Sequence, residues 1–573
     1  MVVVVSTLMS LFVCFTLTPL LVSRFGKLTH PSPKKLGGRL ILWIEKGIDS
    51  LGESYRQLLK WSLFHKRWVL GITFTLLIGS FALVGAGFIG NEFVNMGDRG
   101  ELVVNVELPK SATIEQTNFK TQEVEQYIMS KPEVVSVFSS MGKSDNQFAQ
   151  QGERHKSEIS VKLVDKSKRP MSTEKFSQYL KKDLQTHIGG AKINISNVDI
   201  LGNTSEAPIQ IVLSGGNVDE LLTFADTVLL KMKSVPGNSD PKISIENDKP
   251  EVSVKIDKEK MMGLGLRMDQ VGNIIQIAFS GNSDTKLTQG QYEYDITVKM
   301  DAFNRESINE LEELSFVNGK GETIRLNQFA SVERSIGPSK LERKDRMSSV
   351  TVSCETVGRP QGTVGKEIQA LIEKDPLPAG ISVAYEGNMK QQAEAFGSMG
   401  YALLASIIFV YLIMVALYNS YIYPFVVLFS IPVAMVGALL ALALTMQSLN
   451  IFSILGIIML IGLVAKNAIL LVDFANQMKA EGHDLVHSLL EAGRTRLRPI
   501  LMTTIAMVIG MLPLALASGA GAEWKNGMAW ALIGGLTSSM LLTLVVVPVM
   551  YYIIDKVIAR FSRKKVAFPV PAV

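Results

Sequence analysis

An apolar stretch of membrane-spanning length, residues 451–475, contains one lysine and one aspartate. Lys466 and Asp473 are seven positions apart. On a helix they would share a face about 10 Å apart along the axis, too far to pair directly. A lysine deep in a bilayer costs about 2.5–3.5 kcal/mol on insertion scales, and ionisable groups there commonly mark ion or proton pathways. No other long apolar run contains Asp or Glu, so Lys466 lacks a counter-charge within this sequence.

Three interpretations of Lys466 follow. A partner polypeptide supplies the anion, the lysine is neutral or exposed to water, or its side chain snorkels to the membrane surface. Its position well inside the run favours a role in charge relay over snorkelling. The intramembrane polar residues predicted to share its face are Asn467, Asp473 and Thr504.

The next apolar run carries a second polar pair at the same spacing of seven. Arg496 lies at its cytoplasmic entry and Thr503 in its interior. Thr503 and Thr504 could hydrogen-bond within a polar helix interior. A buried threonine alternatively bonds the carbonyl four residues earlier in its own helix, so Thr503 alone does not establish a function.

The elements that must position these residues are long apolar runs. They cover residues 1–22, 68–89, 399–418, 424–446, 451–475, 500–518 and 528–554. Each has about the 20 residues that a helix needs to cross a bilayer, which predicts seven spans. The 573 residues are 47% hydrophobic, and two cysteines are too few for a disulfide scaffold. A net charge of +5 beside 58 basic residues argues against a nucleic-acid partner.

Basic residues in the short loops predict the orientation. Residues 23–67 contain ten Lys and Arg against three acidic residues, and basic clusters also precede residue 500 and follow residue 555. With seven alternating spans all three segments are cytoplasmic, so residues 90–398 lie outside the cytoplasm. The first run has no basic residue before it, unlike a signal peptide. We therefore expect a truncated or split chain that begins with a helix from the middle of a longer protein. Residues 44–60 have the pattern of an amphipathic helix on the cytoplasmic membrane surface.

The external part alternates strand and helix patterns. Residues 101–198 predict the order β-α-β-β-α-β, a split βαβ unit of ferredoxin-like type. A second such unit begins at residue 209 and resumes near residue 348, after an insertion with its own strands at 251–256 and 292–299 and a helix at 268–278. The predicted fold class is thus a membrane helix bundle joined to an α+β domain outside the cytoplasm.

The sequence contains no nucleophile elbow, P-loop or HExxH motif. We therefore predict neither an enzyme nor a bound cofactor. His483 and His487 stand four apart, which fits a solvated helix face better than a metal pair. The 25 methionines fall mostly where methionine packs in apolar cores, and no metal site is predicted.

Several membrane segments resemble the resistance–nodulation–division (RND) transporters, in particular the hydrophobe/amphiphile multidrug efflux branch. They are 462–474 (GLVAKNAILLVDF), 496–504 (RLRPILMTT), 512–515 (LPLA), 417–420 (LYNS) with Pro424, and 519–521 (GAG). Such pumps have twelve spans and two large periplasmic loops. This chain resembles their sixth span, second loop and seventh to twelfth spans. The resemblance implies that spans one to five, with the aspartate pair that binds transported protons, are missing. It also implies that Lys466, Arg496 and Thr503 form the proton relay.

The resemblance implies names for the parts of the chain. Residues 1–24, 67–90 and 397–556 are membrane helices, 25–66 a cytoplasmic amphipathic segment and 557–573 a cytoplasmic tail. Residues 98–200 form one porter subdomain, 201–248 with 331–390 the second, and 249–330 the docking subdomain. The substrate pocket would include Phe138, Ser140, Met141 and Ser160. The mobile loop beside it would include Gly142, Lys143, Gln147 and Phe148.

The loop is poorer in Gly and Phe than in well-known drug pumps, and Ser160 replaces an aromatic residue. This favours more polar or smaller amphiphiles as substrates. The resemblance predicts the C-terminal half of a proton-driven efflux permease, multi-pass in a bacterial inner membrane and inactive alone. Its implied partners are the missing N-terminal half, two further copies in a homotrimer, a periplasmic adaptor, an outer-membrane channel and the lipid bilayer.

Two alternatives remain. One is half of a heavy-metal efflux pump, for which Met141, Met261 and Met262 would have to line the porter cleft. The other is a membrane subunit that binds a partner and does not transport.

Overall fold

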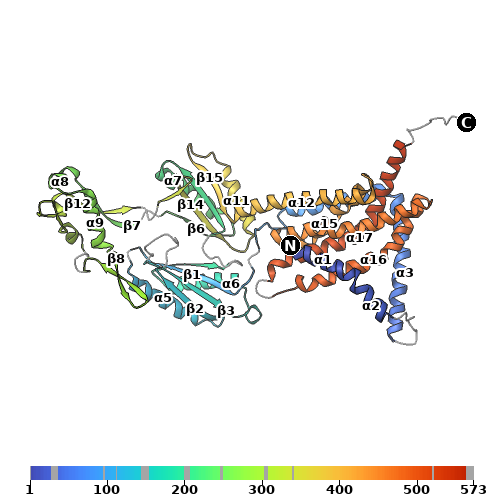
Figure 1. Cartoon of the computed structure of the whole chain (residues 1–573), viewed down its shortest axis with the longest axis horizontal. Helices are drawn as coiled ribbons and strands as arrows, with labels where there is room; N and C mark the ends of the chain where they lie inside the picture. Colours follow the sequence, from blue (N-terminus) through green and yellow to red (C-terminus); the bar gives the residue numbers. More distant parts are fainter. Residues whose placement is uncertain are drawn as a thin grey trace.

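The computed structural model describes residues 2–26, 36–94, 97–110, 112–142, 154–198, 207–245, 249–301, 307–337, 341–518 and 522–562. The molecule is elongated, with a bundle of helices at one end and three α+β units beyond it (Figure 1). Seven helical segments in the described ranges have the length and apolar composition to cross a membrane. The predicted combination of a helical bundle with α+β units is therefore present.

Small residues set the closest helix contact in the bundle. The bundle helices are α4 (Lys66–Gly85), α12 (Asn388–Tyr418), α13 (Tyr423–Leu428), α14 (Ser430–Leu444), α15 (Ile451–Ala480), α16 (Leu485–Ala515) and α17 (Glu523–Ser562). A Cβ on Gly437 of α14 would lie 2.2 Å from the carbonyl oxygen of Gly534 of α17. The two backbones can therefore touch only because both residues are glycine. Helices α14, α15 and α17 are the most buried spans.

Two of the predicted apolar runs are interrupted, and proline explains both breaks. The first run forms α1 (Val2–Phe15) and α2 (Leu17–Phe25), and the fourth forms α13 and α14. Pro19 and Pro432 each lie four residues after the last residue of the preceding helix. A proline removes the N–H that would bond that residue and clashes with its carbonyl.

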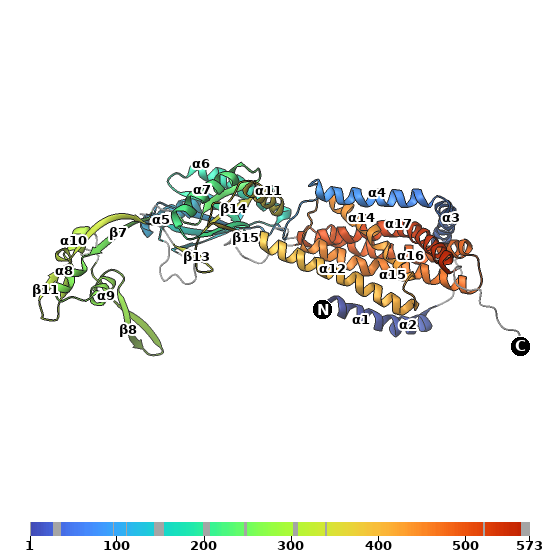
Figure 2. The ribbon, with the colours of Figure 1, turned by 90° about the horizontal axis from the view of Figure 1, so that it is seen from above.

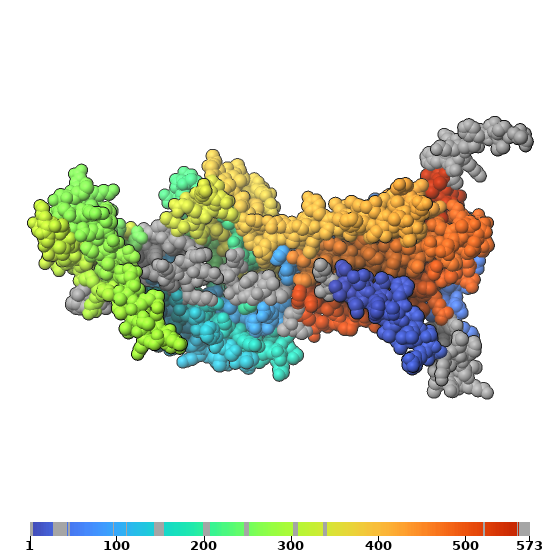
Figure 3. Space-filling model, in the orientation of Figure 1, coloured from blue at the N-terminus to red at the C-terminus, as the bar shows by residue number. Residues whose placement is uncertain are grey.

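Helices α1 and α2 differ from the rest of the bundle in burying none of their described side chains. Figure 2 places them on the side of the bundle opposite α4, and Figure 3 shows them on its outside. The amphipathic helix α3 (Leu36–Phe64) lies across the end of the bundle (Figure 1). Tyr55 and Leu59 of α3 are buried, and the Tyr55 hydroxyl donates to the Leu544 carbonyl of α17 at 2.7 Å. Two leucines of α3 remain exposed: Leu51 is 57% exposed and Leu58 is 50% exposed.

The first α+β unit is a four-stranded antiparallel sheet in the order β2-β3-β1-β4. Its elements are β1 (Glu101–Glu107), α5 (Ile114–Met129), β2 (Val134–Met141), β3 (Lys156–Leu163), α6 (Thr173–His187) and β4 (Lys192–Asn197). Alternate residues of β3, Ile159 and Val161, pack against Phe176 and Leu180 of α6. This is the order of elements that the sequence pattern predicts, and it matches a split βαβ unit.

The second unit repeats this arrangement from two distant segments. Its elements are β5 (Ile209–Gly215), α7 (Val218–Ser234), β6 (Asn238–Ile243), β13 (Glu342–Lys344), β14 (Met347–Thr356), α11 (Gln361–Glu373) and β15 (Ser382–Gly387). Strand β14 pairs with β5, β6 and β13, and β5 pairs with β15. Strand β15 leads directly into the 31-residue helix α12, so the sheet and a membrane helix are covalently adjacent.

The inserted unit hangs from a two-stranded antiparallel ribbon of β7 (Lys249–Ile256) and β12 (Ala330–Gly337). The rest comprises α8 (Lys258–Gly263), α9 (Met268–Phe279), β8 (Asn282–Gln289), β9 (Tyr292–Val298), α10 (Ile308–Glu312), β10 (Ser315–Val317) and β11 (Thr323–Arg325). Its small core includes Val271, Phe316 and Phe329. Strands β8 and β9 form a hairpin arm that extends from the unit (Figure 2), and every β9 residue is exposed.

Candidate functional site

The predicted relay residues lie along the contact between the antiparallel helices α15 and α16. Lys466 Nζ of α15 lies 3.9 Å from the sulfur of Met507 of α16. The guanidinium of Arg496 of α16 lies 4.9 Å from the ring centre of Phe474 of α15. Thr503 falls between these two contacts along α16. Positions 496, 503 and 507 share one helix face because they are separated by about two turns and one turn. The structure thus brings Lys466, Arg496 and Thr503 to one side of this helix pair.

This face is not closed by other described residues. No carboxylate of the described ranges forms an ion pair with Lys466, whose only described polar contact is the weakly accepting sulfur of Met507. Thr503 is exposed, and its hydroxyl donates to the Ile500 carbonyl of its own helix at 3.2 Å. Helix α16 is one of the least buried spans after α1–α2, α4 and α12. The charge of Lys466 is therefore uncompensated within the described chain.

The three polar residues predicted to share the face of Lys466 take different places. Asp473 accepts a hydrogen bond from Gln477 Nε2 at 2.8 Å and makes no ion pair with Lys466 among the described contacts. Asn467 is 4% exposed and Thr504 is 1% exposed. Both turn into the bundle, and neither side chain has a hydrogen-bond partner among the described residues.

The residues predicted for the substrate pocket lie mainly on one face of the first sheet. Phe138 of β2 stands directly opposite Ser160 of β3, and Ser140 stands opposite Glu158. Since Ile159 and Val161 face the helices, Phe138, Ser140 and Ser160 share the opposite face, where Phe138 is 72% exposed. Met141 pairs instead with the buried Ser157, on the helix side.

The predicted mobile loop begins where β2 ends. Gly142 has φ +68°, a left-handed conformation that glycine adopts freely, and its N–H donates to the Lys156 carbonyl at 3.1 Å. The remaining predicted loop residues Lys143, Gln147 and Phe148 lie outside the described residues.

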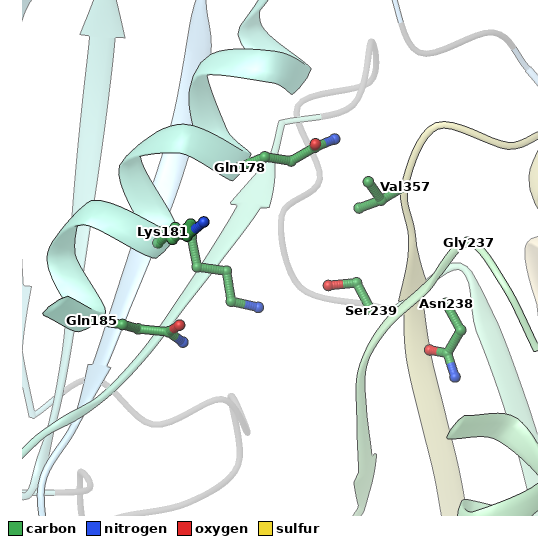
Figure 4. Close-up of a pocket in the computed structure, with 8 residues that line it drawn as sticks. Gln178, Lys181, Gln185, Gly237, Asn238, Ser239 and Val357 are labelled. Atoms are coloured by element: carbon green, nitrogen blue, oxygen red, sulfur yellow. The ribbon is translucent and has the colours of Figure 1, made fainter. Parts of the chain in front are cut away.

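A polar groove of about 400 Å³ separates the first and second units, and the sequence did not reveal it. Helix α6 supplies residues at positions i, i+3, i+4 and i+7, which lie on one face. The groove is lined by Gln178, Lys181, Lys182 and Gln185 from α6 and by Asn238 and Ser239 from β6. Figure 4 shows the α6 side chains across the groove from the β6 segment. The spacing of the α6 residues could have indicated that they share one helix face. It could not indicate that β6 forms the opposite wall, because β6 is distant in sequence.

Charged contacts join the two units beside this groove. Lys181 forms an ion pair with Asp240, and the Glu174 carboxylate accepts the Gly358 N–H at 2.8 Å. Glu355 of β14 lies near Lys242, Asp240 and Lys181. Burial raises the pKa of Glu355 to about 7, because the loss of water outweighs the nearby lysines. The interface therefore contains a carboxyl group that titrates near neutral pH.

A second charged cluster ties the first unit to the membrane helix α17. Arg169 donates to Asp98 Oδ1, and the Thr173 N–H donates to Asp98 Oδ2 at 3.2 Å. Burial alone would raise the pKa of Asp98, but the hydrogen bonds from Thr173 and Arg169 hold it below its usual value. Glu523, at the start of α17, accepts the Asp98 N–H at 2.9 Å and pairs with Lys166. A displacement of α17 would therefore act directly on this unit.

The described residues contain no group of three or more His, Cys, Asp or Glu side chains placed to hold a metal ion. The methionines considered for a metal path are dispersed. Met261 is buried in the core of the inserted unit, Met262 is 63% exposed, and Met141 belongs to the first unit.

The chain is 29% identical over 573 residues to the multidrug resistance protein MdtC of Pectobacterium carotovorum, covering 98% of this chain and 54% of that protein. It is 28% identical over 568 residues to MdtC of Escherichia coli O81, covering 97% and 53%. The chain thus spans about half the length of these curated relatives.

Solved structures share the fold. A crystal structure of a heavy metal efflux pump superposes with a TM-score of 0.75 at 24% identity, covering 88% of this chain and 52% of that one. The sequence pattern of the AcrB/AcrD/AcrF family matches residues 1–555, which include every helix and strand of the relay and of the α+β units. The chain therefore belongs to the AcrB/AcrD/AcrF family of RND permeases.

Proposed function

We propose that this chain forms part of a proton-driven efflux permease that exports amphiphilic small molecules. Membership of the RND permease family supports transport rather than catalysis, and the curated relatives are named multidrug resistance proteins. The observation that best supports the proposal is that Lys466 has no carboxylate partner among the described residues. It lies on the exposed face of the α15–α16 pair, with Arg496 and Thr503 along the same face. An intramembrane charge with no protein counter-ion is costly and is retained where it does work.

In this proposal the carboxylates that bind the transported protons lie in a polypeptide segment corresponding to the other half of the relatives. That segment would cover the exposed side of α16 and the unburied helices α1 and α2. Protonation of its carboxylates would change the partners of Lys466, and α15 would shift against α16. The continuous β15–α12 connection and the Glu523–Asp98 contact would pass the shift to the α+β units. No cofactor is required, because the proton gradient supplies the energy.

The α+β units serve as substrate-handling parts in the same proposal. The first and second units act as porter subdomains, and the inserted unit acts as a docking subdomain. The first unit carries the exposed ring of Phe138 on its open sheet face, and the groove on its α6 side carries amide and lysine side chains. These two surfaces together suit amphiphiles with a substantial polar part, since a small number of polar groups fixes a ligand that is otherwise held by apolar contacts.

The hairpin arm β8–β9 supports assembly with further copies. Tyr292, Tyr294 and Val298 are more than half exposed on the arm. Exposed aromatic residues on a protruding arm fit a contact with another subunit, as in the proposed homotrimer. A periplasmic adaptor and an outer-membrane channel complete the proposed export route from a bacterial inner membrane.

The test is a Lys466→Met substitution in cells that make the protein in its natural context. Export of an amphiphilic fluorescent dye is measured with and without a protonophore. We expect dye retention to rise to the level of cells that lack the protein, because a neutral side chain cannot change partners on protonation. The matched control is Lys60→Met, since Lys60 is an exposed lysine of α3 outside the relay.

Normal export in the Lys466→Met cells would exclude the proton-relay proposal and favour a subunit that binds without transporting. Export of a metal ion rather than the dye, abolished by the same substitution, would favour the heavy-metal alternative. In a strain without endogenous pumps, this chain alone is expected to give no drug resistance.

A further inference from the structure

We propose that one water molecule binds inside the membrane bundle between α15 and α17, with Asn467 as its principal ligand. This site does not depend on the proposed transport function. None of the residues that line it belongs to the proposed relay of Lys466, Arg496 and Thr503.

The first observation is that the side-chain amide of Asn467 is buried without a hydrogen-bond partner among the described residues. Its side chain is 4% exposed, and neither its amide oxygen nor its amide nitrogen has a hydrogen-bond partner among the described residues. Both atoms are already sealed from the surface by the bundle. A further segment or a second chain packed against the outside therefore cannot reach them. Buried amides are nearly always hydrogen-bonded, so the partner must lie within the bundle.

The second observation is a small cavity beside Asn467. Its volume is about 10 Å³, close to the roughly 10–15 Å³ that one water molecule requires. Leu471, Ile500, Met540 and Leu544 form its apolar wall, while Ser539 and Thr543 of α17 line it with hydroxyl groups. These two residues are 0% and 4% exposed.

The hydrogen-bonding capacity of the lining fits a water molecule. The Ser539 and Thr543 hydroxyl oxygens lie 3.0 Å apart and share one hydrogen bond, which leaves one O–H donor and free acceptor positions. Asn467 adds an acceptor oxygen and an NH₂ donor. A buried water generally needs two to four polar partners, and this set provides them. An apolar cavity of the same size would stay dry.

The lining also excludes larger or charged occupants. All seven lining residues are neutral, so no side chain balances the charge of an ion. The volume admits no organic molecule. Lys466, the neighbour of Asn467 in sequence, directs its amine to Met507 instead.

The bound water would join α15 to α17 through exchangeable hydrogen bonds. Elsewhere α17 is held against α14 by direct glycine contact at Gly437 and Gly534. On the α15 side, a water bridge lets the donor and acceptor atoms adjust without an unpaired amide. Asn467 therefore acts as a positioning residue for the helix that carries Lys466.

Hydroxyl-radical footprinting tests the site. The full chain in lipid nanodiscs is exposed to brief X-ray pulses in water enriched in oxygen-18, and methionine oxidation is mapped by mass spectrometry. Met540 lines the cavity, so radicals formed from the bound water should label it. Met414 is 1% exposed and belongs to the apolar core without lining the cavity, so it should stay unlabelled.

Asn467→Leu should reduce the labelling of Met540 several-fold, because leucine fills the site without polar atoms. Thr537→Val is the matched control, since Thr537 is exposed on α17 and donates to its own Ile533 carbonyl. It should leave Met540 unchanged. Labelling of Met540 no greater than that of Met414 in the unaltered chain would overturn the proposal.

Unchanged labelling of Met540 in Asn467→Leu would also overturn it. If Met414 becomes labelled in that variant, the bundle has opened, and Thr543→Val decides the question instead. This near-isosteric change removes one water ligand. It should lower Met540 labelling while Met414 stays protected, and no fall would count against the site.

Discussion

Two cationic side chains, Arg169 in the first α+β unit and Lys466 in the membrane bundle, have opposite surroundings. The Arg169 side chain is 1% exposed and donates to both Asp98 and Thr173. Lys466 is partly buried and contacts only the Met507 sulfur among described polar partners. The charge of Arg169 is thus paired with a carboxylate next to its own unit, whereas the charge of Lys466 has no anionic partner among the described residues.

The difference separates a charge that holds the structure together from one for which we propose a function in transport. A buried ion pair supported by further hydrogen bonds holds its elements in one arrangement, and removal of one partner leaves a costly buried charge. A charge without a protein partner contributes nothing of this kind. Its retention in the membrane requires another reason, which the proposed proton relay supplies.

The largest expected stability effect is that of Asp98→Ala. It leaves Arg169 buried without a counter-charge, which typically costs about 3–5 kcal/mol. Hydrogen–deuterium exchange with mass spectrometry should show faster exchange in β1 and α6. The exposed carboxylate Asp226 provides the control, and Asp226→Ala should leave these segments unchanged.

The double substitution Asp98→Leu with Arg169→Met should recover much of the lost protection, because neither side chain then carries a charge. Equal exchange in Asp98→Ala and the unaltered chain would mean that the Asp98–Arg169 pair does not hold this unit together.

Glu355 offers an intermediate case, a partly buried carboxyl group at the interface between the units. Its pKa is about 7 in the folded chain, above the ordinary value of 4.5. The folded state therefore binds the proton more tightly, and its stability falls as pH rises between about 4.5 and 7. The difference between these two pKa values corresponds to at most about 3.4 kcal/mol.

Glu355→Gln should remove this pH dependence and should stabilise β14 and β6 at pH values above 7. The measurement is hydrogen exchange of these strands, corrected for the intrinsic pH dependence of exchange. Glu394→Gln, at an exposed carboxylate of α12, should reproduce the unaltered profile. A steeper fall in stability with rising pH in Glu355→Gln would reverse the expected sign and contradict the assignment.

Composition and periodicity predicted much of the architecture. Uncharged runs located the apolar helices, and alternation located most strands of the two βαβ-type units. The pattern missed β8, whose sequence NSDTKLTQ is polar and whose residues are nearly all exposed. Its partner β9 is equally exposed, but the sequence YEYDITV has aromatic and β-branched residues at alternate positions, which β8 lacks. The breaks at Thr16 and Phe429 followed from Pro19 and Pro432, which an apolar-run count ignores.

The candidate site was predictable only in its residue types. Spacing placed Arg496 and Thr503 on one face and suggested that Lys466 and Asp473 would not pair. It could not show that Phe474 stacks on Arg496 or that Asn467 is sealed in the bundle, because helix rotation and register depend on packing partners. The groove between α6 and β6 was likewise invisible, since it joins segments about 60 residues apart.

A smaller effect is expected at the Lys181–Asp240 pair between the units. Both side chains are partly exposed, at 20% and 27%, and such pairs typically contribute about 0–1 kcal/mol. Lys181→Met should raise hydrogen exchange only slightly in β6, and added salt should reduce the difference further. Lys182→Met, at the next and more exposed lysine, should have no effect. A loss as large as that of Asp98→Ala would show that this pair is buried in the working protein.

The smallest stability effect should come from Lys466→Met, although the same change should abolish transport. Since no described carboxylate balances the amine, its removal leaves no uncompensated charge, and methionine packs readily against Met507. All five tryptophans lie in α3, α4 and α17, so their fluorescence reports thermal unfolding of the membrane part in detergent. The free energy of unfolding should fall by less than about 1 kcal/mol in the variant. It could even rise, because a buried lysine is costly in hydrocarbon. Lys479→Met, which breaks a pair with Asp555, should cost more. Destabilisation by Lys466→Met comparable to that of Asp98→Ala would mean that Lys466 already has an anionic partner. If Lys466→Met destabilises the protein only when a second polypeptide is bound, that polypeptide supplies the missing carboxylate. Lys466 would then gain its anionic partner on assembly.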